Sequence, residues 1–218
     1  GIMFTGLVRE IGSIVAIKKQ SKGAQLSITA PDSVGELALG DSLAANGICL
    51  TITSIRGNIV NVDAVDETVQ ITTLKTWRSG KKIHLEPALK AGDPMGGHIV
   101  LGHVDGVGKL VSKQQSGSGL ALKFQAPDFV ANYLLPKGSI AIDGVSLTLD
   151  ANPDGNQFSV NIIPHTLSET LLADLRVGDA VNLEADVLAK RKNTEPELKS
   201  GLTVDKILAH GLMRKGKR

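Results

Sequence analysis

The chain carries one sequence pattern twice, at an offset of 96 to 98 residues. Residues 46–51 (NGICLT) return as residues 143–148 (DGVSLT), and residues 80–86 (GKKIHLE) return as residues 178–184 (GDAVNLE). A repeat of this length exceeds the units of solenoid proteins, which need their neighbours to fold. We therefore interpret it as a duplicated small domain. Two similar domains make two similar sites, which suits chemistry on two copies of one molecule.

Length and composition allow two such domains. Each repeat of roughly 90 residues can bury a modest core. The sequence has four Phe, one Trp and one Tyr, so these cores must consist of Val, Ile, Leu and Ala. Its 24 glycines are typical of a protein with many tight turns.

Charge and cysteine content restrict the function class. The formal net charge of +2 is too balanced for a nucleic-acid-binding protein, and the basic run at residues 214–218 is typical of a solvated terminus. A single cysteine excludes an internal disulfide and favours a reducing compartment. No apolar stretch approaches the ~20 residues needed to cross a bilayer, and no signal peptide precedes Met3. We expect a cytoplasmic protein without nucleic-acid or membrane partners.

Several short segments alternate apolar and polar residues with the period of a half-buried strand. They are residues 48–53, 58–63, 145–150 and 157–162, and turn signals separate them. Short strands at this spacing favour a small closed barrel, which also removes exposed sheet edges. We expect an all-β chain with one barrel over residues 3–92 and another over residues 97–188. Short helical turns are expected at residues 68–74, 127–134 and 166–172, with linkers at residues 90–97 and 191–201.

A helix outside the repeat is expected over residues 200–214. Val204, Ile207, Leu208 and Leu212 share one helical face there. This apolar face needs a cover, which is either one of the barrels or a neighbouring subunit. We favour the neighbouring subunit, which would make the helix an oligomerisation element.

The polar face of the repeated strand is the first candidate site. Alternation places Cys49, Thr51 and Thr53 on this face in the first copy, and Ser146, Thr148 and Asp150 in the second. Alternation alone is more typical of a solvated strand surface, and a lone cysteine is more often inert packing than a nucleophile. His98 and His103 are five residues apart, which does not match the i, i+4 pair of a helical zinc site. We predict no metal site.

Five segments together resemble the riboflavin synthase α-chain family. They are residues 3–8 (MFTGLV), 40–51, 96–103 (GGHIVLGH), 137–148 and 182–186, in the order and at the spacing of the family. The resemblance spans residues 3–190. The opening MFTG and the GGHIVLGH segment are specific in combination, so the polar strand face gains a functional interpretation.

The resemblance implies a transferase that dismutates two molecules of 6,7-dimethyl-8-ribityllumazine. One molecule donates a four-carbon unit to the other, which yields riboflavin and 5-amino-6-ribitylamino-2,4-pyrimidinedione in the last step of riboflavin biosynthesis. No cofactor and no metal are implied. The family fold is two similar six-stranded Greek-key barrels with a C-terminal helix. The family enzyme is a homotrimer whose site lies between the N-terminal barrel of one subunit and the C-terminal barrel of its neighbour. An association with a lumazine synthase is left open.

The family pattern carries over residue by residue. It implies catalytic roles for Phe4, Ser42, Cys49, His103, Ser146, Thr148 and Asp186. Contacts to the heterocycle and the ribityl chain are implied for Gly6, Leu7, Val8, Ile48, Leu50, Thr51, Asp63, Ala64, Val65, Asp66, Glu67, Thr68, Gly102, Val104, Lys137, Leu147, Ile163, Pro164, His165, Thr166, Leu167 and Ser168.

The chemistry gives these residues roles. The C7 methyl group of the lumazine is acidic because its anion is delocalised over the ring, so a general base must take a proton. We expect His103, Ser42, Ser146 and Thr148 to form a hydrogen-bonded relay that Asp186 polarises. Cys49 or water could add at C7 of the acceptor. Holding the two rings in register can supply ~7–11 kcal/mol.

Two alternative functions were weighed against the enzyme. Lumazine-binding proteins of the same family hold one chromophore in the N-terminal barrel and catalyse nothing. They resemble this sequence in its first half and lose polar site residues in the second. Lys137, Ser146, Thr148 and Asp186 are all present here, so we favour the enzyme. The balanced charge and the few aromatic residues oppose an oligonucleotide-binding barrel.

Overall fold

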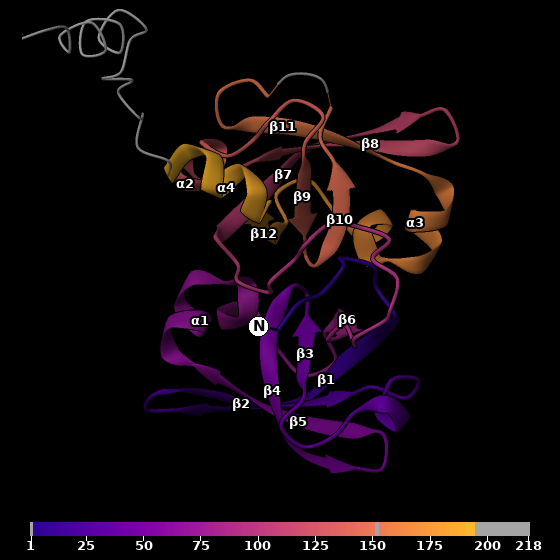
Figure 1. The fold of residues 1–218 in the computed structure, drawn as a ribbon, viewed down its shortest axis with the longest axis vertical. Coiled ribbons are helices and arrows are strands. Elements are labelled where there is room, and N and C mark those ends of the chain that lie inside the picture. Colours follow the sequence, from indigo (N-terminus) through magenta and orange to yellow (C-terminus); the bar gives the residue numbers. More distant parts are fainter. Residues whose placement is uncertain (1, 151–152, 195–218) are drawn as a thin grey trace, which may run out of the picture.

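The computed structural model describes residues 2–150 and 153–194 and has two barrel-like domains stacked on each other (Figure 1). The N-terminal barrel is drawn in indigo to purple and the C-terminal barrel in pink to orange (Figure 1). Strands dominate both domains, and the helices are short. The predicted all-β class with two tandem domains is confirmed.

The N-terminal barrel closes completely. Its strands pair in the order β1-β2-β5-β4-β3-β6, and β6 pairs back onto β1. Leu26, Leu43 and Trp77 lie in a core from which water is excluded. The strands are β1 Glu10–Gln20, β2 Gly23–Thr29, β3 Ser42–Ala45, β4 Ile48–Arg56, β5 Ile59–Val65 and β6 Lys82–Pro87.

The C-terminal barrel repeats this order but closes less completely. Its order, β10-β9-β12-β7-β8-β11, is the order of the first barrel read from β4. Among the described residues, the seam between β10 and β11 is an isolated bridge between Leu149 and Val160. The seam is short because β10 has 4 residues where β4 has 9. The strands are β7 Gly106–Ser116, β8 Gly119–Gln125, β9 Ser139–Ile142, β10 Val145–Thr148, β11 Gln157–Ile162 and β12 Ala180–Ala185.

The repeated motif forms an equivalent hairpin in each barrel. Asn46-Gly47 joins β3 to β4, and Asp143-Gly144 joins β9 to β10. The φ angles are 45° at both Asn46 and Asp143, and 76° and 80° at the glycines. A two-residue turn of this kind needs positive φ at both central positions, which explains the Asn-Gly and Asp-Gly sequences. Beyond the turn, the apolar residues of β4 and β10 point into the cores as the alternation predicted.

The predicted helical turns are confirmed near their expected positions. Thr72 and Thr170 each end one short helix and cap the next: their hydroxyls donate backwards to the carbonyls of Thr68 and Thr166, at 2.6 Å in both cases. The same hydroxyls accept from the next helix, as N-cap residues do. The helices are η1 Val34–Glu36, α1 Asp66–Ile71, η2 Thr73–Thr76, α2 Asp128–Ala131, α3 Pro164–Glu169 and η3 Leu171–Asp174.

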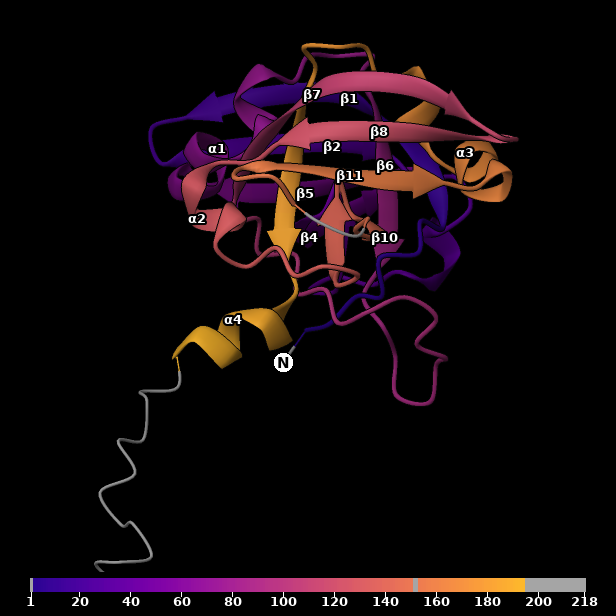
Figure 2. The ribbon, with the colours of Figure 1, turned by 90° about the horizontal axis from the view of Figure 1, so that it is seen from above.

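The predicted linker at residues 191–201 begins as a helix instead. Helix α4, Val187–Thr194, follows β12 directly and projects from the side of the molecule on which the N-terminus lies (Figure 2). The Asp186 side chain starts this helix, since its Oδ1 accepts the backbone N–H of Leu188 at 2.9 Å. The sequence of α4 is polar and lacks an apolar stripe, so alternation and periodicity did not reveal it. The predicted helix at residues 200–214 lies outside the described residues.

Two segments cross between the barrels. Residues 4–8, the N-terminal crossing segment, and residues 100–104, the middle crossing segment, pair through Phe4 and Val100, with N···O distances of 2.7 and 3.1 Å. The middle segment then places Val104 in the core of the N-terminal barrel. The N-terminal segment places Val8 against the core of the C-terminal barrel. Each barrel is therefore completed by the segment that leads into the other barrel.

Candidate active site

A cavity of about 400 Å³ lies on the N-terminal barrel where the middle crossing segment meets β4. Cys49 extends from the polar face of β4, and His103 lies opposite on the crossing segment. One face of helix α1, from Glu67 to Ile71, forms a third side together with Thr72. The lining residues are Ile48, Cys49, Glu67, Thr68, Ile71, Thr72, Gly102, His103 and Val104.

Gly102 allows the crossing segment to lie directly on Cys49. Its carbonyl accepts the backbone N–H of Cys49 at 3.0 Å. A Cβ atom at Gly102 would lie 2.5 Å from the Cβ of Cys49, and the φ of +74° is one that glycine adopts most easily. The predicted contact residues Ile48, Glu67, Thr68, Gly102 and Val104 thus gather around one cavity with Cys49 and His103.

The Cys49 thiol is kept protonated. Burial raises the pKa of Cys49, the neighbouring Glu184 carboxylate adds to the rise, and a hydrogen bond with Ser42 opposes it. Ser42 is itself buried on β3 and so contacts the thiol from beneath the site. A thiol held in this way is a poor nucleophile, since the thiolate is the reactive form.

The C-terminal barrel has an equivalent site around Ser146. The carbonyl of Gly6 accepts the backbone N–H of Ser146 at 2.8 Å, as the carbonyl of Gly102 does for Cys49. A Cβ atom at Gly6 would lie 2.6 Å from the Cβ of Ser146. The N-terminal crossing segment therefore supplies Gly6, Leu7 and Val8 to this site. Helix α3, which carries Pro164 to Ser168, is the counterpart of α1.

Ser146 has a partner that the sequence did not predict. The Nδ1 atom of His98 lies 2.7 Å from the Ser146 Oγ. Burial lowers the pKa of His98, and the charge of Asp186 opposes this change. A neutral imidazole at this distance can accept the proton of the Ser146 hydroxyl. Among the described residues, nothing hydrogen-bonds the buried Nε2 of His98.

The two repeats and the whole chain are similar to known proteins. The family described as Lumazine binding domain matches residues 5–88 and 101–186. A riboflavin synthase from Actinobacillus pleuropneumoniae is 38% identical over 209 residues, 93% of this chain and 97% of that protein. A riboflavin synthase from Bacillus amyloliquefaciens is 40% identical over 188 residues, 86% and 87% of the two chains. The chain belongs to the riboflavin synthase family.

A solved structure shares the architecture of this riboflavin synthase family member. LumP complexed with 6,7-dimethyl-8-(1'-D-ribityl) lumazine superimposes with a TM-score of 0.75 at 27% identity. The match covers 84% of this chain and 99% of that chain.

Within one chain, the structure divides the relay that the family resemblance implied. His103 lines the cavity beside Cys49 on the N-terminal barrel, whereas Ser146 pairs with His98 on the C-terminal barrel. Ser42 contacts Cys49 and so belongs to the first group. Thr148 lies exposed on the outer face of β10, and Asp186 lies at the end of β12 beside α4. The contacts within one chain therefore form two groups, one on each barrel, and a relay that joins them stays a prediction.

Phe4, for which the resemblance implies a catalytic role, is fully buried. Its side chain has 0% exposure and packs with Ala44, Val100 and Ala141 between the barrels. A fully buried ring cannot touch a bound ligand. Phe4 therefore supports the two crossing segments, and its loss would disturb both sites through packing.

The other implied contact residues fall into three groups: core-facing, half-buried and exposed. Leu50, Ala64 and Leu147 point into the barrel cores and can offer a ligand only backbone atoms. Leu167 is half-buried against the C-terminal core, and Thr166 is half-buried in α3. The remaining residues are exposed around the two sites: Thr51, Asp63, Val65 and Asp66 beside the first, and Ile163, Pro164, His165 and Ser168 beside the second.

Lys137 adopts a backbone conformation that is costly for a lysine. Its φ is +60°, and the equivalent residue of the first repeat is Gly40, with φ +85°. A left-handed conformation at a residue other than glycine is typical of functional positions, where it costs ~1–3 kcal/mol. Lys137 thus places an exposed, charged side chain where the first repeat has a glycine.

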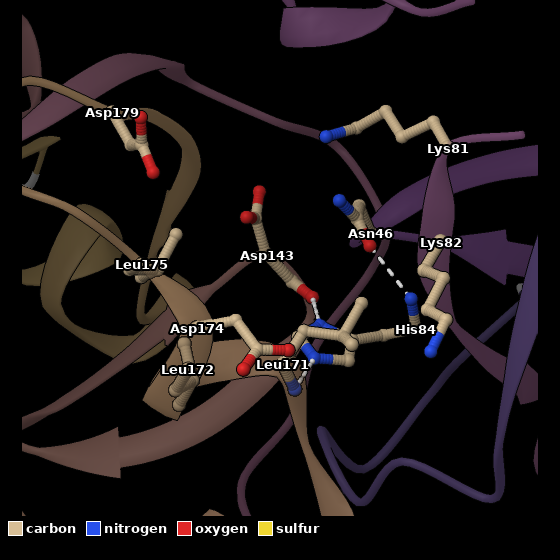
Figure 3. Close-up of a pocket in the computed structure, with 10 residues that line it drawn as sticks. All are labelled: Asn46, Lys81, Lys82, His84, Asp143, Leu171, Leu172, Asp174, Leu175 and Asp179. Carbon is tan, nitrogen blue, oxygen red and sulfur yellow. Dashed lines mark hydrogen bonds between the residues drawn. The ribbon is translucent and has the colours of Figure 1, made fainter.

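A second cavity, of about 220 Å³, lies at the junction of the two barrels (Figure 3). His84 spans this junction: its Nδ1 donates to the carbonyl of Asp143 at 2.8 Å, and its Nε2 accepts the N–H of Leu171 at 2.7 Å. Asn182 makes the mirror-image connection. Its Nδ2 donates to the carbonyl of Asn46 at 2.9 Å, and its Oδ1 accepts the N–H of Thr73 at 2.8 Å. His84 and Asn182 occupy equivalent places in the two repeats, so this junction holds the barrels together.

Burial at the junction disfavours the charged forms of His84 and Asp143. Burial lowers the pKa of His84 to about 4, and Lys81 contributes to this while the Asp143 carbonyl opposes it. Burial raises the pKa of Asp143 to about 7, against the Asn182 N–H and Lys81. The residues around this cavity therefore form a structural contact between the barrels. The two hydrogen bonds of His84 require the tautomer that carries its proton on Nδ1.

The described ranges, residues 2–150 and 153–194, contain neither a metal-binding cluster nor a membrane-spanning helix. In these ranges, no group of three or more His, Cys, Asp or Glu side chains is arranged to hold a metal ion. None of the helices in the same ranges is long and apolar enough to cross a membrane.

Proposed function

We propose that this chain is a riboflavin synthase that converts two molecules of 6,7-dimethyl-8-ribityllumazine into riboflavin and 5-amino-6-ribitylamino-2,4-pyrimidinedione. One observation carries the proposal: the chain presents two equivalent sites that differ at the reacting position. Cys49 pairs with Ser42 in one site, and Ser146 pairs with His98 in the other. A dismutation needs this arrangement, because two identical substrates must play unequal parts.

The Ser146–His98 pair supplies the base. A C7 methyl proton passes to the Ser146 oxygen as the hydroxyl proton passes to Nδ1 of His98, which becomes an imidazolium. Asp186 stabilises this cation, since its charge favours the protonated form of His98. The resulting carbanion adds to a C=N carbon of the second lumazine, and the π electrons of that bond pass to its nitrogen. Later cleavage of the two C–N bonds that held the transferred four-carbon unit releases the pyrimidinedione. Exposed Lys137 is positioned for the ribityl chain or the ring oxygens.

At the N-terminal barrel, the raised pKa of Cys49 favours water over the thiol as the nucleophile in our proposal. Burial keeps the sulfur as a thiol, so water rather than Cys49 adds at C7. Cys49 and His103 then hold the ring of the second lumazine in register. Positioning of this kind can lower the reaction barrier by ~7–11 kcal/mol, so the reaction does not need a dedicated strong base.

A complete site requires a second subunit in this proposal. Exposed apolar side chains border each half-site: Val65 and Ile71 beside the N-terminal one, and Leu7 and Ile163 beside the C-terminal one. Such residues are typical of surfaces that another chain covers. We propose a homotrimer in which the N-terminal barrel of one subunit faces the C-terminal barrel of the next. A reducing compartment such as the cytoplasm would keep the single cysteine as a thiol. Association with a lumazine synthase stays a prediction.

Co-expression of two variants tests this arrangement. His103→Ala damages the N-terminal half-site, and Ser146→Ala damages the C-terminal one. If sites form between subunits, mixed oligomers contain some intact sites and regain riboflavin formation that neither variant shows alone. Absence of any gain in verified mixed oligomers would place both halves of the site within one chain.

Similarity to LumP supports a second candidate, a lumazine-binding protein without turnover. Riboflavin formation distinguishes the two, because a binding protein would hold lumazine unchanged. The Ser146–His98 pair favours the enzyme, since simple binding needs no proton acceptor.

A further inference from the structure

Two buried glutamates hold the crossing segments. Glu184, on β12 of the C-terminal barrel, accepts the backbone N–H of Leu101 at 2.7 Å with one oxygen and that of Gly102 at 3.0 Å with the other. Its side chain is 3% exposed. The carbonyl of the same Gly102 accepts a hydrogen bond from the backbone N–H of Cys49. A carboxylate of one barrel thus fixes the backbone that lies on the reacting position of the other.

Glu86, on β6 of the N-terminal barrel, makes the reciprocal connection. One oxygen accepts the N–H and the hydroxyl of Thr5, both at 2.7 Å, and the other accepts the N–H of Gly6 at 3.1 Å. The Gly6 carbonyl then accepts the backbone N–H of Ser146. Glu86 and Glu184 are 98 residues apart and equivalent in the repeat.

The side-chain chemistry requires a carboxylate at both places. Two neighbouring N–H groups point at two oxygens, so every contact needs an acceptor. A glutamine would fit the space but would turn an NH₂ group toward one of the N–H donors. Burial raises the pKa of both glutamates, to about 7 for Glu184, and the backbone N–H groups oppose this change. The hydrogen bonds therefore favour the charged form that burial disfavours.

We propose that Glu184 is a positioning residue for the lumazine site on the N-terminal barrel and that Glu86 is a positioning residue for the site on the C-terminal barrel. The assignment of these places as lumazine sites rests on the proposed function. Each barrel therefore sets the geometry of the other barrel's half-site, so damage to one glutamate acts across the junction.

Cys49 offers a readout for one half-site, because it is the single cysteine of the chain. The rate of alkylation by iodoacetamide is measured against pH for the full-length wild type and for Glu184→Gln, Glu86→Gln and Glu10→Gln. Glu10→Gln is the matched control: Glu10 is 7% exposed and its two oxygens accept the N–H groups of Asp32 and Ser33, away from both half-sites. The midpoint of this rate–pH profile reports the pKa of the Cys49 thiol and hence the charge near it. The plateau at high pH reports how easily iodoacetamide reaches the sulfur.

Glu184→Gln should raise the plateau about ten-fold, since losing a charge-assisted bond loosens the segment by at least that factor. Glu86→Gln and Glu10→Gln should keep the wild-type plateau, although Glu86→Gln should lower turnover. A shifted midpoint with an unchanged plateau would show that Glu184 acts by charge alone and would overturn the proposal. An equal rise in Glu86→Gln would do the same, because it would indicate general loosening. If Glu184→Gln does not fold, Glu184→Asp keeps both oxygens and should give an intermediate plateau.

A second arm separates this proposal from the proposed function. Bound 6,7-dimethyl-8-ribityllumazine should protect Cys49 in the wild type, and Glu184→Gln should need about ten-fold more ligand for half protection. Absence of protection in the wild type would count against the lumazine site. The plateau without ligand would still show whether Glu184 controls the neighbourhood of Cys49. Wild-type affinity in Glu184→Gln would overturn its positioning role.

Discussion

Replacing His84 by asparagine should remove an acid-sensitive element of the barrel junction. The Nδ1 of His84 must carry a proton for the Asp143 carbonyl, and its Nε2 must be free to accept the Leu171 N–H. Only the neutral ring does both. Asn182 performs the equivalent task in the other direction with a group that does not titrate. His84→Asn therefore substitutes the residue that the repeat already uses.

The magnitude follows from linkage. The pKa of His84 falls from 6.5 to about 4 on folding, so the unfolded chain binds a proton that the folded chain refuses. Stability that is present above pH 6.5 is lost as the pH falls toward 4. At about 1.36 kcal/mol per pH unit, this interval corresponds to about 3 kcal/mol. Asp143 opposes this slope, because its raised pKa makes folding less favourable as the pH rises toward 7, but that contribution is common to both proteins.

Urea unfolding at several pH values measures the effect. Trp77 is the single tryptophan, and its indole N–H donates to Thr73, which bonds Asn182 at the junction, so its fluorescence reports on this region. At a fixed protein concentration, the wild type should lose about 3 kcal/mol more than His84→Asn between about pH 6.5 and pH 4. Some loss at neutral pH is expected from the smaller side chain and does not affect the slope. Equal pH dependence in the two proteins would refute the reasoning.

Two further predictions concern the half-sites. Lys137→Gly should stabilise the fold by ~0.5–1 kcal/mol, since it relieves a left-handed conformation that costs ~1–2 kcal/mol and adds ~0.5–1 kcal/mol of chain entropy to the unfolded state. The same variant should bind lumazine more weakly, which a fluorescence titration measures. A thermal melt measures its stability, and a fall in stability would contradict the account. Ser146→Ala and His98→Gln should each lower turnover by ~10²-fold or more with little change in the free energy of unfolding. Parallel losses of turnover and stability would show that the pair is structural.

Much of the fold was accessible from the sequence because the barrels depend on local patterns. Alternation in β4 and β10 identified which residues face the cores, and the Asn46-Gly47 and Asp143-Gly144 turns fixed the hairpins. Helix α4 was missed because a polar helix held by one capping aspartate leaves no periodic signal. The seam of the C-terminal barrel is incomplete because β10 is short. The length of β10 depends on which strands pair with it, and the local sequence does not show this.

The site was accessible only in part, because contacts between the repeats decide it. The motif resemblance brought Cys49, His103, Gly102 and Ser146 to the candidate site. It could not show that residues 4–8 complete the C-terminal barrel and residues 100–104 the N-terminal one. Within one chain, this exchange of segments places His98 beside Ser146 and His103 beside Cys49. A signal did exist: Gly97-His98 belongs to the same specific motif as Gly102-His103, and its position before the crossing places it beside the other barrel.

The stoichiometry of lumazine consumption tests the central claim most directly. Purified protein is given 6,7-dimethyl-8-ribityllumazine alone, and lumazine, riboflavin and the pyrimidinedione are quantified over time by chromatography. The account predicts that two lumazines disappear for each riboflavin formed, with one pyrimidinedione and without any added cofactor. Lumazine that stays bound and unchanged would identify a binding protein instead and would contradict the proposal that the two half-sites act on two substrates together.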